Sequence, residues 1–64
     1  MNFGIFLKEF RKEQNLTQMQ LAKIIRVQQH ELSSWERGKY LPTIHTLILL
    51  CKALNVTPND LLGF

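Results

Sequence analysis

The sequence predicts an all-α fold: a compact bundle of five helices, of which the second and third meet at a tight turn. Apolar residues recur every three or four positions along most of the chain, which is the spacing of one face of a helix. Residues that typically begin or end helices, such as Thr17, Gly38 and Thr57, separate these stretches. No stretch shows the alternation of apolar and polar residues that is typical of a strand.

Length and composition indicate a single globular domain covering residues 1–64. A chain of 64 residues buries only about 60% of the surface of its unfolded state, so every apolar helix face must contribute to the core. The hydrophobic content of 45% argues against disorder, and no apolar run is long enough for a membrane span. No signal peptide is evident, and the single cysteine, Cys51, agrees with a reducing compartment. We therefore expect a cytoplasmic protein.

The first helix is expected over residues 3–14, because one face of this stretch is apolar. That face carries Phe3, Phe6, Leu7 and Phe10. Asn15 follows, and asparagine tolerates the left-handed backbone conformation that often ends a helix. The second helix, at 18–25, follows Thr17 as N-cap, with Gln20 three residues on in a capping-box pattern. Its inward residues would be Leu21, Ala22 and Ile25.

Three further helices are expected in the second half of the chain. The third covers 28–36, with Leu32 and Trp35 facing inward and Gly38 beyond its end. The fourth covers 44–54, and its predicted inner face consists of Ile44, Leu47, Ile48, Cys51 and Leu54. Thr57 and Pro58 then provide an N-cap and a first-turn proline for a short fifth helix, which adds Leu61 and Leu62 to the core.

The outward side of the third helix has the composition of a surface that reads DNA. It has one cation and no carboxylate, since Glu31 and Glu36 lie on its flanks. A helix that needs only to be soluble usually mixes acidic and basic residues, whereas one that enters the major groove needs amides and hydroxyls and must keep acids away from phosphate. The net charge of +3 also suits a polyanionic partner. The outward residues are Gln29, His30, Ser33, Ser34 and Arg37.

The chain also resembles the helix-turn-helix family of lambdoid phage repressors and Cro, the XRE-like group. The matching residues of the central segment are Leu16-Thr17-Gln18, Leu21-Ala22, Val27, Leu32-Ser33 and Trp35-Glu36-Arg37-Gly38-Lys39. Those of the later segment are Pro42, Leu47, Leu50, Lys52-Ala53-Leu54, Val56-Thr57-Pro58 and Asp60-Leu61-Leu62. The resemblance implies a transcriptional regulator, a repressor, that binds a pseudo-palindromic double-stranded DNA operator as a homodimer, with the third helix in the major groove.

The resemblance further implies roles for particular residues. Base edges would be contacted by Gln29, His30, Ser33 and Ser34, and a glutamine amide has the fork that matches adenine N6 and N7. Phosphates would be contacted by Gln18, Gln28, Arg11, Arg37, Lys39 and Tyr40. Arg11 and Glu36 match a pair that is commonly an ion pair in this family. The dimer contact is expected near the fifth helix, at Leu61, Leu62 and Phe64.

The sequence departs from the family pattern in several places. Arg26 stands where the turn usually has glycine, so either the turn differs locally or a left-handed residue is accepted at a cost of about 1 kcal/mol. Gln28 replaces the usual serine or threonine and is a poorer N-cap. Ile5 and Leu49 are predicted to point away from the core, which makes them candidates for contact with another protein.

Two classes of function remain open from the sequence. The carboxylate-free face of the third helix favours a DNA-binding regulator. The apolar Ile5, Leu49 and Phe64 leave open a protein-interaction module of the same fold, such as an antitoxin-like partner or an antagonist of a regulator. We expect no enzyme, because the chain has no nucleophile with a base and no phosphate loop. No cofactor or metal site is expected either, since His30 and His45 belong to different helices.

Overall fold

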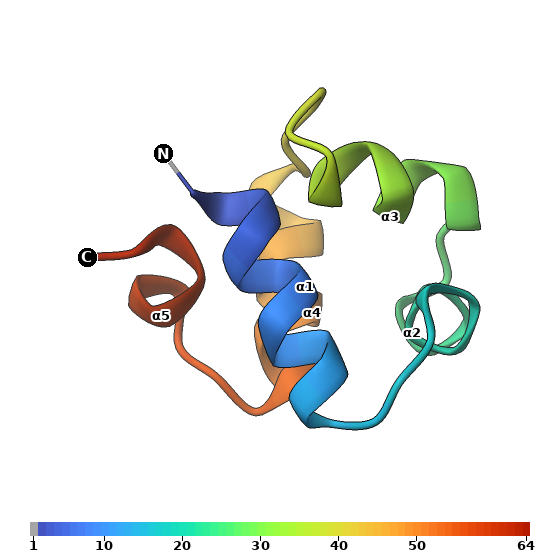
Figure 1. The fold of residues 1–64 in the computed structure, drawn as a ribbon, viewed down its shortest axis with the longest axis horizontal. Coiled ribbons are helices and arrows are strands. Elements are labelled where there is room, and N and C mark those ends of the chain that lie inside the picture. Colours follow the sequence, from blue (N-terminus) through green and yellow to red (C-terminus); the bar gives the residue numbers. More distant parts are fainter. Residues whose placement is uncertain (1) are drawn as a thin grey trace.

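The computed structural model describes residues 2–64, which form five α-helices joined by short turns and no strand (Figure 1). The helices are α1 (Phe3–Glu13), α2 (Gln18–Ile25), α3 (Gln29–Glu36), α4 (Ile44–Leu54) and α5 (Pro58–Leu62). The predicted all-α fold is confirmed, and the helix ends lie within one residue of the expected positions. Residue 1, which the predicted domain includes, lies outside the described residues. No helix in 2–64 is long and apolar enough to cross a membrane.

The five helices enclose one hydrophobic core. α1 packs against α3 and α5, α4 packs against α2 and α5, and α2 packs against α3. In Figure 1, α2 and α3 lie on one side of α1 and α5 lies on the other. Every helix contributes at least one fully buried leucine: Leu7, Leu21, Leu32, Leu50, Leu54 and Leu61. The core that all five helices share therefore holds α3 in place.

Helix caps define the turns on either side of α2. Thr17 and Gln20 form the predicted capping box at the start of α2. At its end, the Arg26 N–H donates to Lys23 O and the Val27 N–H donates to Ala22 O. Arg26 has a φ of 62° and is left-handed. Of the two expected alternatives, the turn therefore keeps the left-handed residue, at the cost of backbone strain at Arg26. Gln28 precedes α3 and makes no side-chain cap hydrogen bond, as its residue type predicts.

The inner face of α4 differs from the prediction. Ile44 is 77% exposed and Ile48 is 44% exposed, whereas Leu50 is fully buried. Leu49, predicted to point away from the core, is half-buried and packs against it. The correction has a physical reason: α4 is apolar on nearly all sides, so its periodicity does not determine its rotation. Packing against α2 and α5 determines it instead.

Cys51 also lies in this core. Burial, and secondarily the Asp60 carboxylate, raise the pKa of the Cys51 thiol above its ordinary value. The thiol therefore remains protonated at neutral pH and behaves as a small apolar side chain.

Gly4 allows α1 to pack closely against the end of α3. A Cβ at this position would lie 2.5 Å from the Trp35 carbonyl oxygen and 2.6 Å from that of Glu36. Both distances are far below van der Waals contact, and both atoms belong to the backbone. The absence of a side chain at Gly4 thus fixes the distance between α1 and α3.

Candidate nucleic-acid interface

α3 presents polar side chains to solvent and is anchored by apolar ones. Leu32 and Trp35 are buried beneath it, while Gln29 and His30 are exposed and Ser33 and Ser34 are half-buried. The Ser34 hydroxyl donates to the His30 carbonyl oxygen at 2.9 Å, which leaves the lone pairs of the hydroxyl oxygen available to a donor. The four residues predicted to read bases thus retain polar atoms at the surface of one helix.

A buried ion pair joins α1 to the end of α3. Arg11 donates from Nε to Glu36 Oε2 at 2.6 Å and from Nη2 to Glu36 Oε1 at 3.1 Å. Nη1 donates to the carbonyl oxygen of Leu16 at 2.7 Å. The two side chains are only 9% and 3% exposed. Glu36 therefore adds no accessible carboxylate to the exposed side of α3.

Arg11, a predicted phosphate contact, makes most of its contacts within the protein. Arg11 is 7% exposed, and all three guanidinium nitrogens donate within the protein. These contacts use three of the five guanidinium N–H groups, and the side chain is only 9% exposed, so little of it is accessible to a phosphate. Its role in this structure is to hold α1, the α1–α2 turn and α3 together.

Gln18 connects the ion pair to the exposed part of α3. The Nε2 of Gln18 donates to Glu36 Oε1 at 3.0 Å. In turn, the Oε1 of Gln18 accepts a hydrogen bond from Gln29 Nε2 at 3.5 Å. Gln29 and Glu36 are seven residues apart, which places them on the same side of the helix. Sequence reasoning assigned Gln18 to a phosphate and missed this bridge, because the contact depends on how α2 packs against α3.

Further polar and cationic groups flank both ends of α3. Gln28 is exposed at its N-terminal end, and Arg37, Lys39 and Tyr40 are exposed beyond its C-terminal end. The exposed Arg37 donates from Nε to Ser33 O at 3.3 Å. The Lys39 N–H donates to Ser34 O at 3.0 Å, which fixes the backbone that carries the Lys39 side chain.

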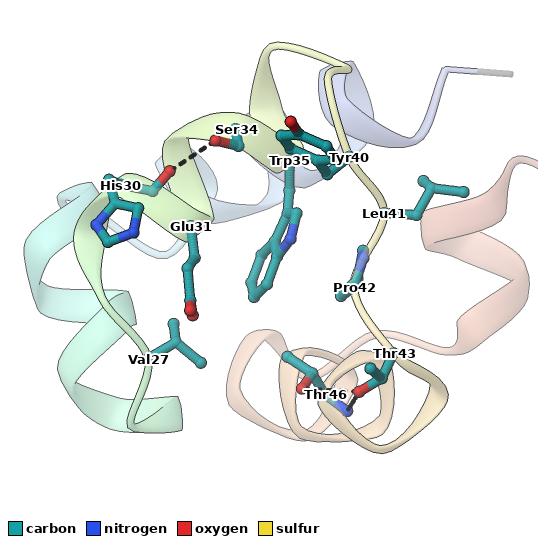
Figure 2. Close-up of a pocket in the computed structure, with 10 residues that line it drawn as sticks. All are labelled: Val27, His30, Glu31, Ser34, Trp35, Tyr40, Leu41, Pro42, Thr43 and Thr46. Carbon is teal, nitrogen blue, oxygen red and sulfur yellow. Dashed lines mark hydrogen bonds between the residues drawn. The ribbon is translucent and has the colours of Figure 1, made fainter.

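A cleft of about 450 Å³ runs between α3 and the segment that leads into α4 (Figure 2). Glu31 extends into it toward Val27, on a different side of α3 from Ser34. Thr43 and Thr46 line the opposite wall, where the Thr43 hydroxyl donates to Thr46 Oγ1 at 3.1 Å. His30 and Ser34 line the same cleft, and Glu31 is exposed; its carboxylate is directed away from Ser34 because the two side chains leave different sides of α3.

The residues predicted to form a dimer contact do not all lie at the surface. Leu61 is fully buried, so it is corrected to a core residue. The capping box of Thr57 and Asp60 starts α5 so that Leu61 faces inward. Leu62 is half-buried, whereas Phe64 is 90% exposed.

The fold and this polar surface agree with similarities to known proteins. Residues 7–61 match the family described as "Helix-turn-helix". The chain belongs to this family. The resemblance to phage repressor and Cro-type domains is confirmed, and a DNA-binding domain of this family is not an enzyme, as the sequence predicts.

Two similar proteins illustrate the range of the family. The chain is 39% identical over 63 residues to the HTH-type transcriptional activator BcrR of Enterococcus faecalis, covering 98% of this chain and 31% of that protein. It is 35% identical over 63 residues to the immunity repressor protein of Bacillus phage phi105, covering 98% of this chain and 44% of the repressor. It thus spans less than half the length of these relatives.

Among solved structures, the DNA-binding domain of the P22 C2 repressor superposes with a TM-score of 0.91 at 32% identity. The match covers 97% of this chain and 82% of that domain. The predicted family and its five-helix fold therefore agree over nearly the whole chain.

Proposed function

We propose that this chain recognises a specific double-stranded DNA sequence, with α3 in the major groove, and that it regulates transcription in the cytoplasm. Binding as a dimer to a pseudo-palindromic operator would place two copies of α3 in successive major grooves. Occupation of promoter DNA then represses transcription. Repression is the direction that the phage repressors among its relatives suggest, while BcrR is named an activator.

The observation that carries this proposal is the position of the two glutamate carboxylates of α3. Glu36 is buried against Arg11 and Glu31 extends along the cleft. The remaining surface offers an amide, an imidazole and two hydroxyls, flanked by Arg37 and Lys39. Hydrogen-bonding groups at the centre with cations at the edge suit base readout combined with phosphate neutralisation.

Polar side chains at one end of α3 and cationic ones at the other would make the positioning contacts. Gln28 and the second N–H of Gln18 lie toward its N-terminal end, while Arg37, Lys39 and Tyr40 lie beyond its C-terminal end. Contacts on both sides of the groove would fix the register of α3 without reading sequence. Base readout then falls to Gln29 and His30, with Ser33 and Ser34 as shorter contacts.

Self-association through the C-terminal end of α5 completes the proposal. Phe64 is 90% exposed, and Leu62, two residues earlier, is half-buried. Two such patches meeting across a two-fold axis would bury a small area, so we expect a weak dimer that DNA stabilises. Leu61 takes no part, because it belongs to the core.

Selection of bound sequences from random DNA duplexes tests this function directly. We expect the chain to enrich two similar half-sites in inverted orientation, with centres about 34 Å apart, or 10 base pairs. Binding of the unselected random pool at the same salt concentration supplies the non-specific reference. Enrichment of no sequence would overturn specific recognition, and enrichment of a single half-site would overturn the dimer.

A specific observation favours a second function, contact with another protein. Ile44 and Ile48 lie one turn apart on α4 and are both exposed, and Ile5 is 57% exposed on α1. The previously predicted Leu49 does not belong to this surface. Crosslinking in cells, compared between the parent chain and Ile44→Lys/Ile48→Lys, tests it. A partner captured only by the parent would support this function, and identical crosslinks would exclude it.

A further inference from the structure

We propose that the cleft between α3 and the segment leading into α4 binds a small organic cation, an alkylammonium compound that also carries a carbonyl group, and that the bound compound releases DNA. The release of DNA rests on the proposed function, whereas the binding of the compound does not. Three observations support the site: its size and lining, a carboxylate without a cationic partner, and a buried indole N–H without an acceptor.

The cleft has the size and lining of a small-molecule site. Its volume is about 450 Å³, within the range of about 300–1,000 Å³ that is usual for such sites. Val27, Trp35 and Pro42 supply apolar surface, and a few polar groups lie among them. Apolar walls with a small number of polar groups are typical of pockets that bind organic molecules.

The first polar group is the carboxylate of Glu31, which extends along the cleft toward Val27 (Figure 2). Within residues 2–64, the ion pair that forms joins Arg11 to Glu36 and leaves Glu31 without a cationic partner. The described residues that line the cleft include no lysine or arginine. An ionised carboxylate only accepts hydrogen bonds, so this part of the cleft favours an ammonium group.

The second polar group is the indole N–H of Trp35. Trp35 is only 7% exposed, and its ring nitrogen makes no hydrogen bond to the other residues that line the cleft (Figure 2). No fully buried side-chain nitrogen or oxygen of the described residues lacks a partner, so this N–H opens onto the cleft. A donor left without an acceptor is costly, and a ligand carbonyl oxygen would satisfy it.

The wall formed by α4 adds a further donor. The Thr43 hydroxyl donates to Thr46 Oγ1 at 3.1 Å, and the Thr46 N–H donates to Thr43 Oγ1 at 3.3 Å. The hydrogen of the Thr46 hydroxyl therefore remains available to a ligand. Donors from Trp35 and Thr46 suit a carbonyl oxygen, and the apolar walls suit a methylene chain between that carbonyl and the ammonium group.

Occupation of the cleft should exclude DNA, because the cleft shares residues with the proposed base-reading surface. His30 and Ser34 belong to its lining, and both are assigned to base contacts in the proposed function. A compound that lies against these side chains occupies space that the DNA needs. The compound and the operator therefore compete, and the compound acts as an inducer.

The fluorescence of Trp35, the only tryptophan of the chain, reports binding directly. The probes are ω-amino amides with three to six methylene groups. Hexanamide, which lacks the ammonium group, and hexylamine, which lacks the carbonyl group, are the control compounds. We expect a dissociation constant of about 1 mM for the best amino amide and binding at least about threefold weaker for each control. Equal binding of either control, or no binding of any amino amide, would overturn the site.

A substitution in the cleft tests the role of the carboxylate. Glu31→Gln removes the charge and keeps the shape, so it should weaken amino amide binding about three- to fivefold and leave hexanamide binding unchanged. Glu9→Gln removes an exposed carboxylate from α1 and is the matched control, with parental affinity for both compounds. Parental affinity of Glu31→Gln for the amino amide would overturn the assignment.

Titration with DNA at constant ionic strength tests the release. At ten times its dissociation constant, the amino amide should weaken binding of the parent chain to its selected duplex about tenfold, and that of Glu31→Gln only about three- to fourfold. Unchanged DNA affinity with an occupied cleft would overturn the competition. A parent chain that selects no duplex would overturn the proposed function, while the fluorescence titration still decides whether the site exists.

Discussion

The Arg11–Glu36 pair is the residue-scale feature that joins α1 and the α1–α2 turn to α3. Transfer of two charges from water into the core opposes folding, and the mutual attraction of the charges with three hydrogen bonds offsets that cost. The net contribution of such a pair is small. The loss of one partner has a much larger effect, because the remaining charge stays buried without compensation.

Arg11→Met should therefore lower the free energy of unfolding by about 3–5 kcal/mol. The variant keeps most of the apolar volume but leaves the buried Glu36 carboxylate without its cation, with only the hydrogen bond from Gln18 remaining of those described here. Urea unfolding followed by circular dichroism measures the effect. The double variant Arg11→Met/Glu36→Met removes both charges and should recover much of the loss. Equal destabilisation by the single and double variants would show that desolvation of Glu36 is not the cause.

Base readout and phosphate contact should respond differently to single substitutions. Gln29→Ala should weaken cognate binding by about 1–3 kcal/mol and relax preference at one base position in each half-site. Lys39→Ala should weaken cognate and random DNA alike and reduce the salt slope by about one per half-site. Titrations at several salt concentrations measure both effects. If Gln29→Ala weakened random and cognate DNA equally, α3 would not read bases through this residue.

At the scale of helices, the turn between α2 and α3 contains strain that can be removed. Arg26 has a φ of 62°, which costs a residue with a side chain about 1–2 kcal/mol. Arg26→Gly removes that strain but gives the unfolded chain more freedom, so the net gain should be up to about 1 kcal/mol. Thermal unfolding should show a rise of up to about 8 °C in Tm.

Asn55→Gly supplies the control for this turn, because Asn55 has a φ of 58° and asparagine tolerates that conformation. Its gain should be smaller than that of Arg26→Gly. A loss of stability in Arg26→Gly would mean that the Arg26 side chain makes a favourable interaction that outweighs the backbone strain.

The contact of α1 with α3 should be sensitive to one methyl group. Alanine favours a helix over glycine by about 1 kcal/mol, yet Gly4→Ala places its Cβ 2.5 and 2.6 Å from two carbonyl oxygens. Overpacking of this kind costs about 1–3 kcal/mol, and backbone atoms cannot turn aside as a side chain can. We expect net destabilisation in urea unfolding and weaker DNA binding. Lys8→Ala, on the exposed side of α1, should stay within about 0.5 kcal/mol of the parent.

At the scale of the whole molecule, self-association should depend on the C-terminal end of α5 rather than on α4. Phe64→Ser removes the most exposed large apolar side chain and should abolish cooperative binding to a two-half-site operator. Binding to a single half-site should persist, because α3 is untouched. Sedimentation and DNA titration measure the two effects. Ile48→Lys, on the exposed face of α4, is the control; loss of association in that variant alone would place the dimer contact on α4.

The sequence by itself determined the helices and their ends. Threonine caps, left-handed asparagines and a first-turn proline act through local hydrogen bonds and backbone sterics, which need no partner from elsewhere in the chain. The polar face of α3 was also predictable, because Leu32 and Trp35 orient an amphipathic helix of this kind unambiguously.

Tertiary structure alone decided which side of α4 is buried and which polar groups remain free. The apolar surface of α4 surrounds most of the helix, so packing against α2 and α5 turned Ile44 and Ile48 outward and Leu50 inward. Arg11 and Gln18 could each have served a phosphate by residue type. Only the approach of α1 and α2 to α3 brought them to Glu36, because hydrogen bonds between distant residues depend on positions that the whole core sets.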